Sequence, residues 1–219
     1  MKAIAVIPVR AGSSRLPRKP LALLAGRPML QWVHEAARAA TAVSEVIVAT
    51  DDAEIRAAAC GFGARCVMTD GQPRNGTERI LQALERDGGA TAAPAAEIVV
   101  NVQGDEPLLT GPIIDAVVAA LVGDPQAVVA TVAVPWRDEA DLADPNAVKV
   151  VLDSHGRALY FSRAPIPHVR EKSGVAPVLW KHLGIYGYQR HFLLRFPLLE
   201  PTPLEQSEQL EQLRALEHG

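Results

Sequence analysis

The chain has 219 residues, 48% of them hydrophobic, and a formal net charge of −3. This length predicts one α/β domain, with or without a smaller lobe, and this apolar content excludes a disordered chain. The nearly neutral charge argues against a general nucleic-acid or membrane surface, so any basic site must be local.

The chain has two cysteines, Cys60 and Cys66. Neither has a histidine or cysteine neighbour at metal-binding spacing, and we interpret them as reduced thiols of a cytoplasmic protein. No stretch is long and apolar enough to span a membrane, and the first apolar run is too short for a secretory signal. We therefore expect no membrane partner.

The first apolar run, residues 3–7, predicts a buried strand and leads into a loop, residues 8–20, with a proline at each end. Small residues let backbone N–H groups approach an anion, and arginine offers a planar fork that fits phosphate oxygens. The pattern predicts a polyphosphate site; the alternative is a solvated basic loop. The spacings typical of P-loop NTPases and dinucleotide-binding folds are absent. The loop's cations and small residues are Arg10, Gly12, Ser13, Ser14, Arg15, Arg18 and Lys19.

Short apolar runs alternate with segments of helical spacing as far as Pro135. This alternation predicts a mostly parallel sheet with helices on both faces. Polar loops after the first, third and fourth strands then lie at the edge where open α/β sheets bind ligands. The predicted strands are residues 45–50, 64–68, 98–102 and 127–134, and the predicted helices are residues 28–40, 52–61, 78–86 and 112–121, with Asp52 and Thr77 as N-caps.

The rhythm changes after Pro135, where strands and turns replace the alternation. We therefore divide the chain into an α/β core, residues 1–135, and a smaller antiparallel part of the same domain, residues 136–219. The second part is expected to contain strands at 147–152, 157–161 and 180–188, a turn at 153–156, an exposed loop at 162–177, and helices at 189–196 and 203–217.

Asp105 directly follows the predicted strand 98–102, within a Gln-Gly-Asp-Glu-Pro segment. Magnesium prefers one or two carboxylates together with phosphate oxygens, so Asp105 suits a metal ion beside a bound polyphosphate. The alternative is a solvated or helix-capping acid in a turn.

The segment 75–79 offers a second polar group at a strand end. Asn75 has two amide donors and a carbonyl acceptor, which suits the recognition of a nucleobase edge. Thr77 could be no more than a helix cap, and Glu78 and Arg79 could be no more than a surface pair.

His182, Tyr186 and Tyr188 occupy alternate positions of the last predicted strand and face one side of it. They suit a polyhydroxylated or acidic ligand, and the alternative is a core or a subunit interface. Arg163 follows a predicted strand and could hold a carboxylate through two parallel hydrogen bonds. Four polar residues of the last helix are more typical of a solvated face, unless that helix packs across a dimer. They are Glu208, Glu211, Gln212 and Arg214.

Taken together and in order, these segments resemble the 3-deoxy-manno-octulosonate cytidylyltransferase family, from Ile4 to Gly219. The resemblance implies a Rossmann-like nucleotidyltransferase fold, with residues 1–135 as the nucleotide-binding core and residues 136–219 as the sugar-binding and dimerisation part. It implies transfer of CMP from CTP to the sugar acid 3-deoxy-manno-octulosonate (Kdo), with release of pyrophosphate, for lipopolysaccharide synthesis. The motifs that carry it are residues 10–20, 48–51, 75–79, 101–107, 145–150, 158–163, 182–188 and 210–214.

The resemblance also implies roles for individual residues, and a homodimer with neither nucleic acid nor a membrane as partner. The implied catalytic residues are Arg10, Lys19 and Asp105, with Asp105 also holding Mg²⁺. The implied nucleotide contacts are Arg10, Ala11, Gly12, Ser13, Arg15, Lys19, Asn75, Gly76 and Thr77. The implied sugar contacts are Gln103, Arg163, His182, Tyr186, Glu211 and Gln212.

Some positions depart from the family pattern. Arg18 stands where the family usually has glycine, and Pro73 lies where a histidine is usual. Family members usually continue past Gly219 with a strand and an Asp-Thr-Pro-Glu-Asp segment, whose aspartate supplies a further metal ligand. We expect either that the chain is truncated or that it finds a second carboxylate elsewhere.

Two alternatives remain open from the sequence. One is CMP activation of another acidic sugar, such as a sialic acid or an amino analogue of Kdo. The strand 182–188 together with Arg163 favours the Kdo branch. The other is a catalytically impaired homologue that binds CTP without turnover.

Overall fold

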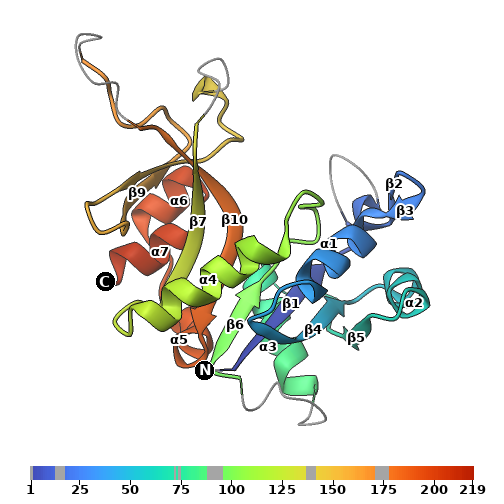
Figure 1. Ribbon diagram of the computed structural model, residues 1–219. Coiled ribbons are helices and arrows are strands. Elements are labelled where there is room, and N and C mark those ends of the chain that lie inside the picture. The colour runs from blue at the N-terminus through green and yellow to red at the C-terminus, as the bar shows by residue number, and fades with distance from the viewer. Residues whose placement is uncertain are drawn as a thin grey trace. The chain divides into compact units, whose positions relative to one another are not determined.

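The structure is a computed structural model that describes residues 2–12, 18–71, 73, 75–87, 96–136, 142–170 and 178–219 (Figure 1). Its contacts divide the chain into two compact units, each made of two segments. Unit 1 is Met1–Ala130 with Ile185–Pro197, and unit 2 is Thr131–Gly184 with Leu198–Gly219. The sequence suggested one division after residue 135, and it did not anticipate that residues 185–197 return to the first unit.

Unit 1 is built on a sheet whose strand order is β5-β4-β1-β6-β10. The first four strands are parallel, and residues 186–189 of β10 pair with β6 in the antiparallel sense. Strand β1 lies in the centre, with Val6 beside Ile47 of β4 and Asn101 of β6. The strands are β1 (Ala3–Val9), β4 (Val43–Thr50), β5 (Arg65–Met68), β6 (Ile98–Asn101) and β10 (Trp180–Gln189).

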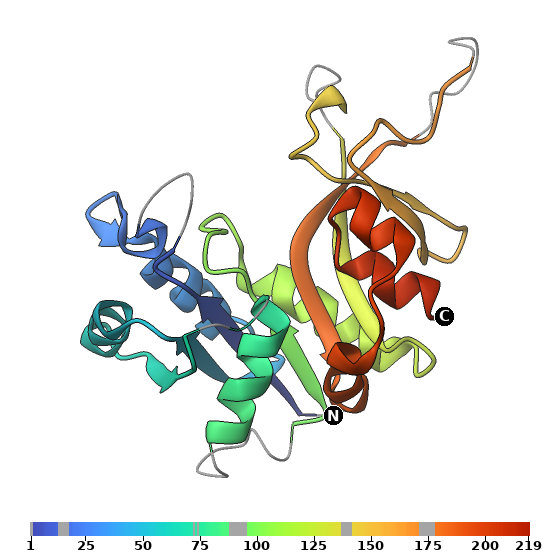
Figure 2. The same cartoon turned by 180° about the vertical axis from the view of Figure 1, so that it is seen from behind.

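Helices cover both faces of this sheet, as the alternation of strands and helices predicted (Figures 1 and 2). Helix α3 lies on one face, and α1 and α4 lie on the other. The central strand β1 (AIAVIPV) and residues 98–100 of β6 are apolar and almost wholly buried because both of their faces are covered. The helices are α1 (Met29–Arg38), α2 (Ala53–Gly61), α3 (Gly76–Arg86), α4 (Gly111–Gly123) and α5 (Arg190–Arg195), with one-turn 3₁₀ helices at Lys19–Leu21 and Phe196–Leu198 and a small hairpin of β2 (Leu23–Leu24) and β3 (Arg27–Pro28).

The α3 face of the sheet carries a fully buried core cluster, which α5 extends. Its members are Ile4, Val6, Ile47, Ala49, Ile80, Ala83, Leu84, Ala96, Val99, Tyr188 and Leu193. On the other face, α1 and α4 approach closely at Gly111, where a Cβ atom would lie 2.8 Å from the carbonyl carbon of Ala39. Only glycine fits there without displacing backbone.

Unit 2 is a smaller antiparallel sheet covered by two short helices. Residues 180–181 of β10 pair with β8 (Lys149–Leu152), which pairs with β9 (Ala158–Ser162). Strand β7 (Val129–Pro135) also pairs with β10. Helices α6 (Pro203–Glu208) and α7 (Gln212–Glu217) follow Leu198. The core of the unit is Val150, Phe161, Leu210 and Leu213.

Two predicted helix boundaries are wrong. The final helix is broken, because Gln209 adopts a left-handed conformation (φ 53°) between α6 and α7. The N-cap of α3 is Asn75, whose side-chain oxygen accepts the Glu78 N–H at 2.9 Å, and Thr77 is a buried residue of the first turn. The prediction that Asp52 caps α2 is confirmed.

No helix within the described ranges combines the length and the apolar content that crossing a membrane requires.

Candidate functional site

The carboxyl ends of β1 and β6 lie next to each other in unit 1 because these strands are parallel neighbours. Arg10 follows β1 and is exposed, as is Gly12, while Ala11 is partly buried. The Ala11 carbonyl accepts the Arg18 N–H at 3.2 Å, so the two described ends of the basic loop meet. Ser13 and Arg15 lie outside the described residues.

Lys19 and Asp105 meet at this edge. The Lys19 ammonium donates to Asp105 Oδ2 at 2.7 Å, and their side chains are 33% and 49% exposed. The neighbouring Gly104 packs tightly on the end of β1, since a Cβ atom there would lie 3.0 Å from Val9 Cγ1. A cation from the first loop and a carboxylate from the turn after β6 thus lie together, at the sheet edge where the sequence placed both loops.

Gln103 and Tyr186 flank this place on the β6 side. Gln103 Nε2 donates to Asn101 Oδ1 at 3.2 Å, and Asn101 itself is buried. Tyr186 pairs with Asn101 in the β10–β6 register, which sets it at the carboxyl end of β6. Its ring stacks with Tyr188 at 6.1 Å between centroids.

The N-terminus of α3 reaches the same edge on the other side of β1. A Cβ atom on Gly76 would lie 3.5 Å from the Pro8 side chain, an ordinary contact that places this helix end against β1. The Asn75 side-chain oxygen caps the helix, and its amide group belongs to the same helix end. The end of an 11-residue helix also contributes a positive dipole that favours an anion.

Arg79 is buried rather than part of a surface pair, which corrects that alternative. Its side chain is 5% exposed, lies 3.1 Å from Asp51 Oδ1 and donates to Thr69 Oγ1 at 2.6 Å. Asp51 and Thr69 follow β4 and β5, so this arginine ties α3 to the ends of two strands. The sequence could not reveal this, because Arg79 and its two partners come from three separate segments.

The donor groups at this edge fit Mg²⁺ held jointly with a nucleotide. Asp105 is a half-exposed carboxylate that already accepts a cation, the Lys19 ammonium. Within the described ranges, no group of three or more histidine, cysteine, aspartate or glutamate side chains could hold a metal ion alone. One carboxylate plus phosphate oxygens is the usual arrangement for Mg²⁺ at nucleotide sites.

The remaining predicted sugar contacts belong to unit 2, where His182 faces the interior. His182 is 8% exposed, with Nε2 2.8 Å from Thr131 Oγ1 and its ring edge-on to Phe161 at 5.0 Å. Burial lowers the pKa of His182 to about 4, so the imidazole is neutral at pH 7.

Arg163 follows β9, and its guanidinium binds backbone. Nε donates to the Glu208 carbonyl at 2.7 Å, Nη1 to the Pro145 carbonyl at 2.7 Å and Nη2 to the Gln209 carbonyl at 3.2 Å. These contacts use three of the five N–H groups that an arginine has, and contacts among the described residues leave two for a further acceptor.

The last two helices are only partly the solvated face that their charges suggested. Glu208 and Arg214 are held by other groups: Glu208 accepts the Arg163 N–H at 2.8 Å, and Arg214 pairs with Glu205 at 2.6 Å. Glu211 and Gln212 are partly buried at the start of α7.

Lys149 is a buried cation that the sequence analysis did not single out. It is fully buried, and its ammonium donates to the carbonyls of Asp144, Ala147 and Arg163 at 2.6–2.8 Å. Burial lowers its pKa. A lysine between apolar residues in a predicted strand was the only available signal, because it suggests an inward-facing cation with backbone partners.

Comparison with known proteins agrees with this arrangement. A family model described as "Cytidylyltransferase" matches residues 4–219. A protein of Syntrophobacter fumaroxidans named 3-deoxy-manno-octulosonate cytidylyltransferase is 49% identical, over 100% of this chain and 86% of its own length. A protein of the same name from Idiomarina loihiensis is 49% identical, over 98% of this chain and 85% of its own length.

Two solved structures of cytidylyltransferases are also similar to this chain. The structure of CMP:2-keto-3-deoxy-manno-octonic acid synthetase complexed with CTP matches with a TM-score of 0.91 at 39% identity, over 100% of this chain and 87% of that chain. A cytidylyltransferase from Leptospira borgpetersenii matches with a TM-score of 0.57 at 17% identity, which shows the fold alone. The chain belongs to the cytidylyltransferase family.

Proposed function

We propose that this protein is a 3-deoxy-manno-octulosonate cytidylyltransferase. It joins CTP and Kdo to give CMP-Kdo and pyrophosphate, a step in lipopolysaccharide synthesis. The anomeric hydroxyl of Kdo attacks the α-phosphorus of CTP, the bond to the β-phosphate oxygen breaks, and the hydroxyl proton is lost. The observation that carries the proposal is the meeting of Lys19 and Asp105 at the ligand edge of a chain 39% identical to a synthetase complexed with CTP.

The basic loop and the β6 turn supply the charges that this reaction needs. Arg10 and Lys19 hold the triphosphate and offset charge as pyrophosphate leaves, together with Arg15 of the same loop. Positioning and electrostatic stabilisation dominate such phosphoryl chemistry. Mg²⁺, held by Asp105 and phosphate oxygens, supplies Lewis-acid polarisation of the phosphates when bound.

The cytosine pocket is assigned to the first loop and the start of α3. Ala11, Gly12 and Ser13 provide small groups and backbone donors, and the amide donors of Asn75 can bind the acceptor atoms of the base. Gly76 and Thr77 complete the helix end whose dipole faces the nucleotide.

We assign the sugar acid to the residues that the family resemblance implies. Arg163 has two N–H groups left for the Kdo carboxylate. His182 is neutral, so it offers a hydrogen bond rather than a charge. The other assigned contacts are Gln103, Tyr186, Glu211 and Gln212.

The active protein is further proposed to be a cytoplasmic homodimer. Cys60 and Cys66 are free thiols, which suits a reducing compartment. Large apolar side chains are exposed in unit 2, among them Leu159, Val169 and Val178, and exposed apolar groups favour a subunit contact. Sedimentation analysis of the purified protein measures the oligomeric state.

The deciding experiment is pyrophosphate release from CTP and Mg²⁺, with Kdo and with a sialic acid in parallel. Release with Kdo alone is expected. Release with the sialic acid alone assigns the protein to the other branch of acidic-sugar activation. If neither sugar supports release while CTP still raises the melting temperature, the protein is a CTP-binding homologue without turnover.

A further inference from the structure

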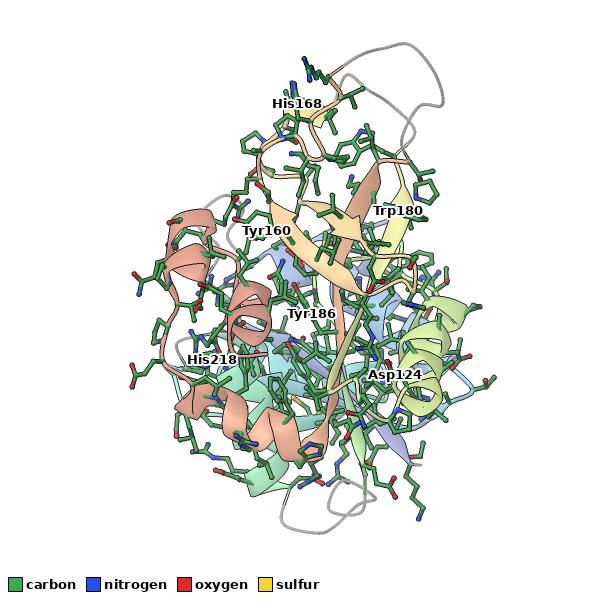
Figure 3. The ribbon with its side chains drawn as sticks, turned by 90° about the vertical axis from the view of Figure 1, so that its left-hand side faces the viewer. Asp124, Tyr160, His168, Trp180, Tyr186 and His218 are labelled. Atoms are coloured by element: carbon green, nitrogen blue, oxygen red, sulfur yellow. The ribbon has the colours of Figure 1, made fainter. Side chains whose placement is uncertain are left out.

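Glu208 is the centre of a hydrogen-bonded clamp in unit 2 that none of the assigned roles explains. One carboxylate oxygen accepts the backbone N–H of Arg163 at 2.8 Å. The other accepts the hydroxyls of Ser162 at 2.5 Å and Tyr160 at 3.3 Å. Figure 3 shows Tyr160 on β9, on the side that faces the last helices. These bonds hold the pKa of Glu208 below its usual value although burial opposes them, so the group is an anion.

The contacts between Glu208 and Arg163 are reciprocal. The Glu208 carboxylate holds the backbone of Arg163, and the Arg163 side chain holds the backbone carbonyls of Glu208 and Gln209. Gln209 is in the left-handed region (φ 53°), which turns the chain from α6 into α7 at this point. The pair therefore fixes the guanidinium and the start of α7 with respect to β9.

Lys149 supports the same clamp from the other side. Its ammonium binds the Arg163 carbonyl at 2.6 Å and the carbonyls of Asp144 and Ala147, which flank the Pro145 carbonyl that Arg163 Nη1 binds. The backbone of Arg163 is thus bound at its N–H by Glu208 and at its carbonyl by Lys149. Two charged side chains thus hold the Arg163 backbone while three backbone carbonyls bind its guanidinium, and the connected bonds restrict the guanidinium to one orientation.

We propose that Glu208 is a positioning residue for the sugar acid: it fixes Arg163 so that the two remaining N–H groups face the carboxylate. The inference rests on the proposed function. A carboxylate bound by a preorganised arginine fork gains more than one bound by a mobile side chain, because less rotamer entropy is lost on binding. Glu208 itself touches no substrate, and it acts through Arg163 and through the corner that precedes Glu211 and Gln212.

The test compares Glu208→Ala and Glu208→Gln with Glu205→Gln. Glu205 lies on the same helix, but it pairs with Arg214 within the helix pair and touches neither β9 nor Arg163 in the described contacts. Its loss should lower the melting temperature and leave both Michaelis constants unchanged. It therefore controls for a merely structural effect of loosening α6 and α7.

Glu208→Ala should raise the KM for Kdo by about tenfold, the order expected from losing a charged hydrogen bond. The KM for CTP should stay within about twofold, since no CTP contact is altered. Glu208→Gln should lie between Glu208→Ala and the wild type, because the amide keeps an oxygen for the Arg163 N–H while the hydroxyls can reverse and accept. Amide hydrogen exchange of the peptide that contains Arg163 should accelerate in Glu208→Ala and not in Glu205→Gln.

The proposal is overturned if Glu205→Gln raises the KM for Kdo as much as Glu208→Ala does, or if Glu208→Ala raises both Michaelis constants equally. Unchanged exchange at Arg163 in Glu208→Ala also overturns it. If the wild-type protein releases no pyrophosphate with Kdo, the proposed function fails instead, and the exchange experiment alone then decides whether Glu208 fixes Arg163.

Discussion

Lys19 in unit 1 and Lys149 in unit 2 both have their ammonium groups bound, yet their surroundings differ in kind. Lys19 is one-third exposed and binds a single carboxylate that is itself half exposed. Lys149 is fully buried and binds three backbone carbonyls. An exposed ion pair contributes little to stability and can be exchanged for a ligand, whereas a buried ammonium cannot leave its partners without a large cost. The surroundings of Lys19 thus suit ligand binding, whereas those of Lys149 suit a structural role.

The largest effect on stability is expected from removing the buried ammonium of Lys149. Lys149→Met leaves three carbonyls without a donor, and we expect the free energy of unfolding to fall by about 3 kcal/mol. Urea unfolding measures this loss. Lys181→Met, on the exposed part of β10, should change it by less than about 0.5 kcal/mol. Equal losses for the two variants would contradict a special role for the buried lysine.

Acidification should weaken unit 2 through its buried histidine. The pKa of His182 is lowered by burial to about 4, whereas an unfolded histidine titrates near 6.5. The folded state therefore binds fewer protons than the unfolded state between these values, and stability is lost as pH falls from about 6.5 to about 4. The shift corresponds to about 3 kcal/mol at most.

The control for this pH effect is His182→Gln, which should flatten the stability profile in that window. His34 in unit 1 also has a lowered pKa, caused mainly by burial, so the wild-type profile contains both residues. The difference between the wild type and the variant isolates His182. An identical slope in both proteins would mean that His182 is protonated in the folded state.

A substitution of Asp105 at the sheet edge of unit 1 should lower the activity and leave the stability nearly unchanged. Asp105→Asn should lower pyrophosphate release by about a hundredfold, because the metal loses its only assigned protein ligand. The exposed pair with Lys19 is worth less than about 1 kcal/mol, so the melting temperature should hardly change. Asp52→Asn, which keeps an N-cap at the neighbouring β4 end, is the matched control and should leave both readouts unchanged. A large stability loss in Asp105→Asn would assign this edge a structural role.

The same difference explains what the sequence could predict. The strands of unit 1 were found because buried parallel strands are continuous apolar runs, and the loops at their ends followed from topology. The loops that carry Lys19 and Asp105 therefore share an edge as expected, while the contact between the two side chains was not predicted. The break at Gln209 could not be predicted, since the leucines of residues 204–216 suit one continuous helix and no glycine or proline interrupts it. What fixes the corner is Arg163, a residue far away in the chain.

Arg79 and His182 are also buried through contacts that the sequence could not predict. Each is a polar residue in a local pattern that suited an exposed or ligand-facing side chain. Each is buried because of partners on other segments: Asp51 and Thr69 for Arg79, and Thr131 for His182. Sequence periodicity reports which face of an element is apolar, but it carries no information on which distant polar groups will satisfy a buried cation or imidazole.

The smallest expected effect concerns Arg18, the residue of the basic loop that precedes Lys19. Arg18 adopts φ 57°, a left-handed conformation that costs roughly 1 kcal/mol for a residue with a Cβ atom, and its guanidinium pairs with Glu54 at 2.6 Å. Arg18→Gly removes that strain but also loses the exposed ion pair and makes the unfolded chain more flexible. These terms nearly cancel, so the free energy of unfolding should change by less than about 0.5 kcal/mol.

Ala25→Gly separates the two contributions. Ala25 also has a positive φ of 48°, but its methyl side chain cannot form an ion pair. Ala25→Gly should therefore be at least as stabilising as Arg18→Gly. Urea unfolding of both variants measures the difference, which is the contribution of the Arg18–Glu54 pair. If Arg18→Gly instead destabilises by more than about 1 kcal/mol, the Arg18–Glu54 pair contributes more than exposed ion pairs usually do. The contrast between the exposed pair of Lys19 and the buried Lys149 would then not extend to the residue that precedes Lys19.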